Sequence, residues 1–191
     1  MRGTSTARRL LITGRPGSGK STLFRRVASE LERLGCRVGG ISAPEVREAG
    51  RRVGFLIVDL ATGERAWLAR LGPGAGPRVG RYTVNVEEAG RLGAAAVERA
   101  LREADVVAID EIGPMELLIP RLREAITRAA AEAPRLLAVV HARLPRRDPE
   151  LWRLLRGGSR LVEVTIENRG RLQAMAGELA GWLVGGGGCG G

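Results

Sequence analysis

A short segment near the start of the chain has the composition of a phosphate-binding loop. Residues 14–21 read Gly-Arg-Pro-Gly-Ser-Gly-Lys-Ser and match the pattern G-x-x-x-x-G-K-[ST] without a gap. The glycines let the loop curl so that successive backbone N–H groups face an anion, and the following helix adds its positive end. The motif predicts a nucleoside triphosphate site made by Gly14, Arg15, Pro16, Gly17, Ser18, Gly19, Lys20, Ser21 and Thr22.

Three side chains of this segment have distinct predicted roles. Lys20 supplies a mobile charge for the β- and γ-phosphates, and the Ser21 hydroxyl suits Mg²⁺. Thr22 is placed to hydrogen-bond an α-phosphate oxygen. The alternative is a glycine-rich connection that binds nothing. It is disfavoured because the motif lies between an apolar run at 10–12 and an amphipathic stretch.

Two adjacent carboxylates, Asp110 and Glu111, form the second candidate group at the end of the apolar run 106–109. Asp110 is predicted to hold Mg²⁺ through a water, and Glu111 to orient and deprotonate an attacking water. Gly113 completes Asp-x-x-Gly, and its backbone N–H is a candidate γ-phosphate contact. The alternative, two carboxylates that only cap the turn at Gly113-Pro114, is less favoured because a phosphate loop precedes them.

The elements that must position these groups are strands that alternate with helices. Apolar strand-like runs alternate with stretches of helical periodicity, which include 86–103 and a last helix over 168–183, and Gly35 is placed to end the first helix. This pattern predicts an α/β fold with a mostly parallel sheet covered by helices on both faces. Strand-like runs between turn sequences suggest a small antiparallel insertion at about 44–84. We expect one domain over 1–184 and a disordered glycine-rich tail at 185–191.

The charge of the chain is unusual in kind as well as in amount. The 191 residues include 31 Lys and Arg against 21 Asp and Glu, a formal net charge of +10, and Lys20 is the only lysine. Functions that need a second lysine are therefore excluded, among them guanine recognition by an Asn-Lys-x-Asp motif. Excess arginine suits nucleic acid, but 3% aromatic residues provide few stacking surfaces. Nucleic acid is thus an alternative partner that the composition does not favour.

Membrane insertion and disulfide bonding are not expected from the sequence. No apolar run approaches the ~18 residues that a membrane-spanning helix needs, and the run at 10–12 is too short for a signal peptide. Cys36 and Cys189 lie far apart and lack metal-binding spacing. We therefore expect neither a disulfide nor a zinc site, and a cytoplasmic monomer.

Several segments together resemble a nucleoside-triphosphatase family of archaea, thermophilic bacteria and animals, sometimes called cancer-related nucleoside triphosphatase. The resemblance covers most of the chain and is most distinctive at 110–116, Asp-Glu-Ile-Gly-Pro-Met-Glu. It implies a small RecA-like P-loop NTPase fold with a catalytic glutamate after the Mg²⁺-binding aspartate. It also implies Mg²⁺-dependent hydrolysis of ATP, GTP and other triphosphates, with little choice of base. The remaining matching segments are the loop from Gly14, 45–48, 50–55, 79–84 and 164–169.

Five further polar residues are weaker candidates. Arg47, Arg51 and Arg52 lie in the insertion and are candidates for a lid or an arginine finger over the triphosphate. The alternative for them is the solvated face of a hairpin. Asn168 and Arg169 begin the last helix. The resemblance favours nucleotide contact there, although Asn is also an ordinary N-cap.

Two other functions stay open on the sequence alone. One is a P-loop kinase that moves the γ-phosphate to a nucleoside or small-molecule acceptor; an arginine-rich lid and an acceptor pocket beside Glu111 would favour it. The other is a nucleotide-gated nucleic-acid binder, which the net charge favours and the scarcity of aromatic residues disfavours.

Overall fold

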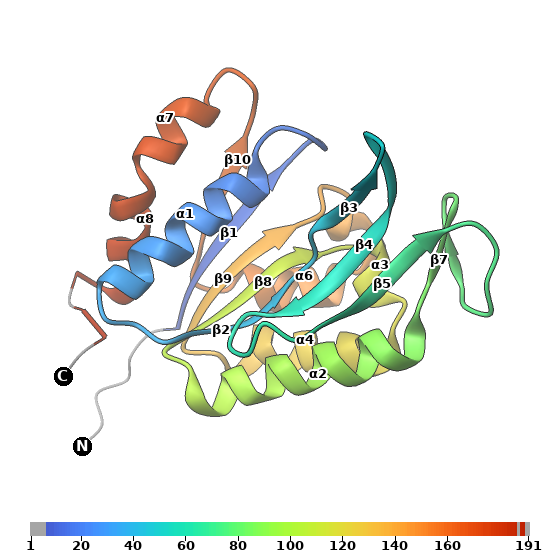
Figure 1. The fold of residues 1–191 in the computed structure, drawn as a ribbon. Coiled ribbons are helices and arrows are strands. Elements are labelled where there is room, and N and C mark those ends of the chain that lie inside the picture. The colour runs from blue at the N-terminus through green and yellow to red at the C-terminus, as the bar shows by residue number, and fades with distance from the viewer. Residues whose placement is uncertain (1–6, 187, 190–191) are drawn as a thin grey trace.

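One mixed sheet organises the computed structural model, which describes residues 7–186, 188 and 189 (Figure 1). Within these residues ten strands belong to the sheet, and nine of them follow one another across it. Their order is β10 (Ser159–Val164), β1 (Arg8–Gly14), β9 (Arg135–Val140), β8 (Val106–Ile112), β2 (Val38–Ser42), β4 (Arg51–Asp59), β5 (Arg65–Leu71), β7 (Tyr82–Val84) and β6 (Arg78–Val79), while β3 (Glu45–Glu48) pairs with β4 alone.

The first five strands of this order are parallel and carry both candidate motifs. β1 pairs with β10 and β9, and β8 pairs with β9 and β2, in each case in parallel. β9 therefore separates the strand before the phosphate loop from the strand that ends in the two carboxylates. Apolar residues fill these strands because both faces of a parallel sheet are covered. The structure confirms the predicted α/β fold of the P-loop NTPase class.

The antiparallel part of the sheet is larger than the sequence suggested. β4 joins the parallel strands by antiparallel pairing with β2, and the insertion contributes five strands of the described chain. The sheet as a whole is therefore mixed, and "mostly parallel" applies only to the half that carries the motifs. Strands β3 and β6 were not predicted, because they are short and largely exposed and so lack an apolar alternation.

Helices cover both faces of the sheet (Figure 1). One face carries α1, α7 and α8, which bury an apolar layer against β1 and its neighbours, and the other carries α2, α4 and α6. The short helices α3 and α5 follow β8 and β9 directly. The bounds are α1 (Lys20–Arg33), α2 (Val86–Glu103), α3 (Pro114–Leu117), α4 (Pro120–Glu132), α5 (Leu144–Arg147), α6 (Pro149–Arg156), α7 (Arg169–Ala174) and α8 (Ala176–Val184).

The predicted last helix over 168–183 is divided in the structure. Met175 has φ −85° and ψ 7°, ends α7 and precedes the first residue of α8. α8 packs on α1, and its Leu179 and Leu183 are fully buried. The single apolar periodicity of this stretch did not reveal the interruption.

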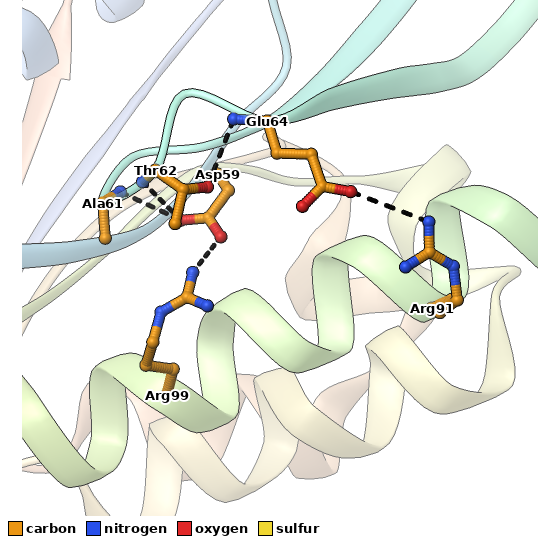
Figure 2. Close-up of polar contacts among 6 residues, drawn as sticks. All are labelled: Asp59, Ala61, Thr62, Glu64, Arg91 and Arg99. Atoms are coloured by element: carbon orange, nitrogen blue, oxygen red, sulfur yellow. Dashed lines mark hydrogen bonds and ion pairs between the residues drawn. The ribbon is translucent and has the colours of Figure 1, made fainter.

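A buried ion pair attaches the insertion to α2. Asp59, at the end of β4, is 2% exposed and accepts hydrogen bonds from the N–H groups of Ala61 and Thr62 at 2.9 and 3.4 Å. Its other carboxylate oxygen pairs with Arg99 of α2 (Figure 2). The same carboxylate therefore shapes the turn before β5 and ties that turn to the helix beneath the sheet.

The expectation that the cysteines stay apart is wrong. Cys36 and Cys189 form a disulfide, with 4.7 Å between their Cα atoms. Cys36 follows the end of α1, where Gly35 has φ 79°, and the N–H of Cys189 donates to Leu34 O at 3.3 Å. Of the predicted disordered tail, Gly187, Gly190 and Gly191 lie outside the described residues, and disorder of the tail stays a prediction.

No helix among residues 7–186, 188 and 189 is both long enough and apolar enough to cross a membrane. The cytoplasmic location and the monomeric state stay predictions.

Candidate active site

The phosphate loop connects β1 to α1 with backbone conformations that only glycine adopts readily. Gly14, Gly17 and Gly19 have φ values of 145°, 77° and 107°. At Gly14 a Cβ atom would also lie 2.3 Å from Val164 O, because the loop packs closely on the end of β10. The motif has glycine at these positions because the backbone of the loop takes positive φ values there, as a curled phosphate-binding loop predicts.

Two side chains of the loop are turned toward its interior. Lys20 Nζ donates to Arg15 O at 3.2 Å, so the ammonium group lies across the loop. Ser18 is 4% exposed, and its hydroxyl oxygen is buried without a hydrogen-bond partner among the described residues. A buried hydroxyl usually has a partner. The loop thus has a polar group to offer to a bound anion.

The end of β8 brings Asp110 to the start of α1. Asp110 is 8% exposed, and the Ser21 hydroxyl donates a hydrogen bond to its carboxylate. Burial, the largest cause, and the nearby charge of Glu111 together raise the pKa of Asp110 to about 6, although the hydrogen bond from Ser21 opposes the shift. The structure thus brings together the two side chains that the sequence predicted as Mg²⁺ ligands.

Glu111 lies in the same buried acidic region. Burial raises the pKa of its carboxyl group, and the positive charge of Lys20 opposes that shift. The Glu111 carboxylate is therefore close enough to Lys20 of the phosphate loop for an electrostatic interaction. A poorly solvated carboxylate with a raised pKa is a better proton acceptor than an exposed one.

A third carboxyl group, Glu116, is the site residue that sequence reasoning missed. It is 5% exposed, and burial, with the charges of Glu111 and Asp110, raises its pKa to about 8. It accepts hydrogen bonds from its own N–H and from that of Gly113. A Cβ atom on Gly113 would lie 3.1 Å from Glu116 Oε2 and 3.3 Å from Glu111 Oε1, so both carboxyl groups meet at this glycine.

A sequence signal for Glu116 was available. Gly113 is the N-cap of α3, Pro114 occupies the first helical position, and Glu116 the third, where a glutamate reaches back to the N-cap N–H. Glu116 lies beside the Gly113 N–H, and contact of that N–H with the γ-phosphate stays a prediction.

Asn168 and Arg169, the two predicted nucleotide contacts near the last helices, have different surroundings in the structure. Asn168 closes the loop after β10, since its Oδ1 accepts from Thr165 N at 2.8 Å and its Nδ2 donates to Glu163 O at 2.9 Å. Arg169 begins α7 beside the phosphate loop, where its Cβ lies 3.7 Å from the position of a Cβ on Gly19. Nucleotide contact by either residue stays a prediction, and the position of Arg169 suits it better.

The arginines of the insertion lie on the β3–β4 hairpin, which projects beyond the same edge of the sheet as the phosphate loop (Figure 1). Arg47 and Arg52 each pair with a Glu45 carboxylate oxygen at 2.5 Å, and Arg52 also lies over the ring of Phe55. Arg51 is exposed at the start of β4. Two of the three predicted lid arginines are thus engaged within the hairpin, and a role as arginine finger stays a prediction.

His141 lies at the end of β9, between the strands that carry the two motifs. Its Nδ1 accepts the N–H of Arg143 at 3.2 Å, so the ring proton of the neutral histidine is on Nε2. Burial lowers the pKa of His141, and the charges of Arg147, Lys20 and Arg143 lower it further. The histidine is therefore uncharged at neutral pH.

Comparison with known proteins identifies the relatives of this arrangement. A model of the NTPase family matches residues 9–176. The nucleoside-triphosphatase THEP1 of Thermofilum pendens is 47% identical over 163 residues, which are 85% of this chain and 90% of that protein. The protein of the same name from Ignicoccus hospitalis is 53% identical over 148 residues, 76% of this chain and 81% of the other.

Two solved structures share the fold. The crystal structure of THEP1 from the hyperthermophile Aquifex aeolicus aligns with a TM-score of 0.75 and 32% identity, over 92% of this chain and 98% of that one. The solution structure of a human cancer-related nucleoside triphosphatase aligns with a TM-score of 0.70 and 32% identity, over 88% of this chain and 94% of the other.

Proposed function

Because the chain belongs to the NTPase family and is a nucleoside triphosphatase, we propose that it hydrolyses ATP, GTP and other nucleoside triphosphates to the diphosphate and phosphate with Mg²⁺. The observation that carries the proposal is the meeting of three groups at one sheet edge. These are the loop with Lys20, the Ser21–Asp110 pair and the half-buried Glu111.

The residues present suit Mg²⁺. The Ser21 hydroxyl and the Asp110 carboxylate provide two neighbouring oxygen ligands. Within the described part of the chain no group of three or more His, Cys, Asp or Glu side chains is arranged to hold a metal ion. Mg²⁺ is commonly held by one or two protein oxygens, with water and substrate phosphates completing its shell. When bound, the ion neutralises charge on the β- and γ-phosphates.

The chain's own residues then divide the reaction among them. The loop N–H groups and Lys20 hold the triphosphate, and Glu111 orients a water and takes its proton as that water attacks the γ-phosphorus. Lys20 stabilises the charge that develops on the phosphate oxygens. The diphosphate leaves from the loop, and the proton on Glu111 passes to solvent.

Broad use of bases is supported by what the site lacks. Lys20 is the only lysine of the chain and lies in the phosphate loop, so no second lysine is available for an Asn-Lys-x-Asp guanine site. The contacts that we assign bind the triphosphate part alone. We therefore propose that rates with ATP and GTP are of similar size.

Replacement of the general base tests the proposal. Glu111→Gln keeps the size of the side chain and removes the proton acceptor, so phosphate release from ATP and GTP should fall about a hundredfold or more while ATP binding persists. Glu124→Gln is the matched control, because Glu124 is exposed on α4. Unchanged phosphate release from the Glu111 variant would contradict the proposed function.

A further inference from the structure

A cavity of about 500 Å³ lies against the carboxyl ends of β8 and β9. Its walls come from the turn after β8, from α3, α4 and α5, and from β6 of the insertion. No residue of the phosphate loop lines it, so the cavity is separate from the cradle of the triphosphate. Its volume is in the range of small-molecule sites, ~300–1,000 Å³.

The lining of this cavity combines apolar side chains with arginines. Ile112, Leu117 and Leu144 contribute apolar surface, and two exposed arginines, Arg78 of β6 and Arg147 of α5, also line the cavity. Neither arginine has an ion-pair partner among the described residues.

A third arginine of the lining is already neutralised. Arg123 of α4 lies 2.7 Å from Asp148 Oδ2, so its charge is balanced within the protein. Two free guanidinium groups beside apolar surface suit a ligand with a carbon skeleton and a phosphate group, which guanidinium binds through paired hydrogen bonds.

The cavity shares a wall with the catalytic centre. Ile112 and Gly113 line it and follow Glu111 directly, and a Cβ on Gly113 would lie 3.3 Å from Glu111 Oε1. His141 also lines it, and the charges of both Lys20 and Arg147 act on that ring. A hydroxyl group in the cavity can therefore face the Glu111 carboxylate, which we propose takes the proton of the attacking water in hydrolysis.

We propose that this cavity is an acceptor site, where a small organic phosphate with a free hydroxyl group binds and receives the γ-phosphoryl group. The proposal rests on the proposed function, because it uses the same loop and the same Glu111. Arg78 and Arg147 bind the acceptor's own phosphate, and the apolar side chains contact its skeleton. Hydrolysis is then the reaction that occurs when water occupies the place of the hydroxyl group.

The transfer step is balanced without a further reactant. The acceptor hydroxyl oxygen forms a bond to the γ-phosphorus while the bond from that phosphorus to the β–γ bridging oxygen breaks. The electron pair of the broken bond leaves with the nucleoside diphosphate. The hydroxyl proton passes to the Glu111 carboxylate and from there to solvent, and the acceptor gains one phosphoryl group.

A label-transfer assay tests this assignment. The full chain is incubated with Mg²⁺ and ATP carrying a radioactive γ-phosphate, and with glycerol 3-phosphate, ribose 5-phosphate or each ribonucleoside 5′-monophosphate. We expect label on a hydroxyl oxygen of at least one probe. In Arg147→Glu and Arg78→Glu the ratio of label on that probe to label in inorganic phosphate should fall about ten- to hundredfold. Arg153→Glu, on the exposed side of α6, should not change the ratio.

Two outcomes would overturn the acceptor site. One is the absence of label on every probe while hydrolysis still depends on Glu111, a result that leaves the proposed function intact. The other is label on a probe's phosphate group, giving a diphosphate, because the acceptor would then bind in the opposite orientation. Hydrolysis that does not depend on Glu111 would instead contradict the proposed function itself.

Discussion

At the scale of single residues, the site is a cluster of carboxyl groups opposed by one ammonium group. Asp110, Glu111 and Glu116 are all poorly exposed, and each has a raised pKa for which burial is the largest cause. Lys20 lowers the pKa of the first two, whereas Glu116 is surrounded by like charges. At neutral pH Glu116 is therefore the member of the cluster that keeps its proton.

The protonation of Glu116 predicts a specific pH dependence of stability. Its pKa rises from 4.5 to about 8 on folding, so between these values the folded chain holds a proton that the unfolded chain has lost. Stability from this group therefore falls as pH rises through that window, by at most about 1.4 kcal/mol per pH unit. Glu116→Gln, which cannot ionise, should gain stability relative to the natural chain as pH rises from 5 to 8.

Thermal melts of the nucleotide-free chain at both pH values measure this effect. Glu124→Gln serves again as the exposed control and should show the same difference from the natural chain at both pH values. A constant difference for Glu116→Gln as well would mean that Glu116 is ionised in the folded state.

Residue-scale prediction from sequence was most specific where chemistry fixes the spacing. The loop from Gly14 to Ser21 and the Asp110–Glu111 pair lie near each other in the structure, and their binding of phosphate and Mg²⁺ stays a prediction. Glu116 was missed because its raised pKa depends on burial, which is decided by how distant segments pack around α3.

At the scale of elements, the pair of Asp59 and Arg99 connects the antiparallel half of the sheet to α2. Burial alone would raise the pKa of Asp59, but hydrogen bonds from Arg99, Ala61 and Thr62 hold it below its ordinary value. The neighbouring pair of Glu64 and Arg91 is longer, at 3.7 Å, and exposed (Figure 2). The two arginines lie on the same helix and so form a natural comparison.

Arg99→Ala is expected to destabilise the fold by about 2–3 kcal/mol, because it leaves the buried Asp59 carboxylate without its main partner. Arg91→Ala should cost below about 1 kcal/mol, since an exposed pair contributes little. Because the pKa of Asp59 is lowered on folding, its contribution is present above pH 4 and is lost as pH falls below that value. The effect of Arg99→Ala should therefore shrink toward pH 3.

Urea unfolding of both variants at pH 6 and pH 3 checks this expectation. Equal losses for Arg99→Ala and Arg91→Ala at pH 6 would show that the buried pair contributes no more than a surface pair.

Element-scale prediction succeeded for segments with a strong apolar period. The helix expected at 86–103 has those bounds in the structure, and Gly35 follows the end of α1 as its sequence suggested. Strands β3 and β6 and the division of α7 from α8 were missed. The strands bury too little to show alternation, and the division keeps the same apolar period on both sides of Met175.

At the scale of the whole molecule, the disulfide between Cys36 and Cys189 links segments 153 residues apart. A cross-link of that span lowers the entropy of the unfolded chain, with an upper bound of about 5 kcal/mol. Reduction should therefore lower the melting temperature and the urea midpoint. Disulfides inside cells are rare outside hyperthermophiles. In any other organism this bond would disfavour the predicted cytoplasmic location.

Thiol titration decides whether the bond forms. Protein purified without reductant and then denatured should show no free thiol, and two after reduction. A variant with both cysteines changed to serine should match the stability of the reduced natural chain. Two thiols without reduction would contradict the bond.

Sequence reasoning missed the disulfide and the cavity for the same reason. Both depend on which distant segments become neighbours: Cys189 with the end of α1, and β6 of the insertion with α5. The glycine-rich composition at 185–191 describes the segment of Cys189 but not its neighbour at the end of α1. The basic run at 143–147 describes α5 but not its neighbour β6. The strand order that makes them neighbours had to come from the fold.

The strand order also has a consequence for synthesis on the ribosome. β1 is the first strand to be made, yet its sheet neighbours β9 and β10 are among the last. Until residues 135–140 have emerged, β1 has no parallel partner, although β2 and β8 can already pair with each other. The phosphate loop therefore lacks its support for most of translation. β1, with its apolar run, is therefore the parallel strand that waits longest for a partner, so its apolar surface stays exposed for most of synthesis.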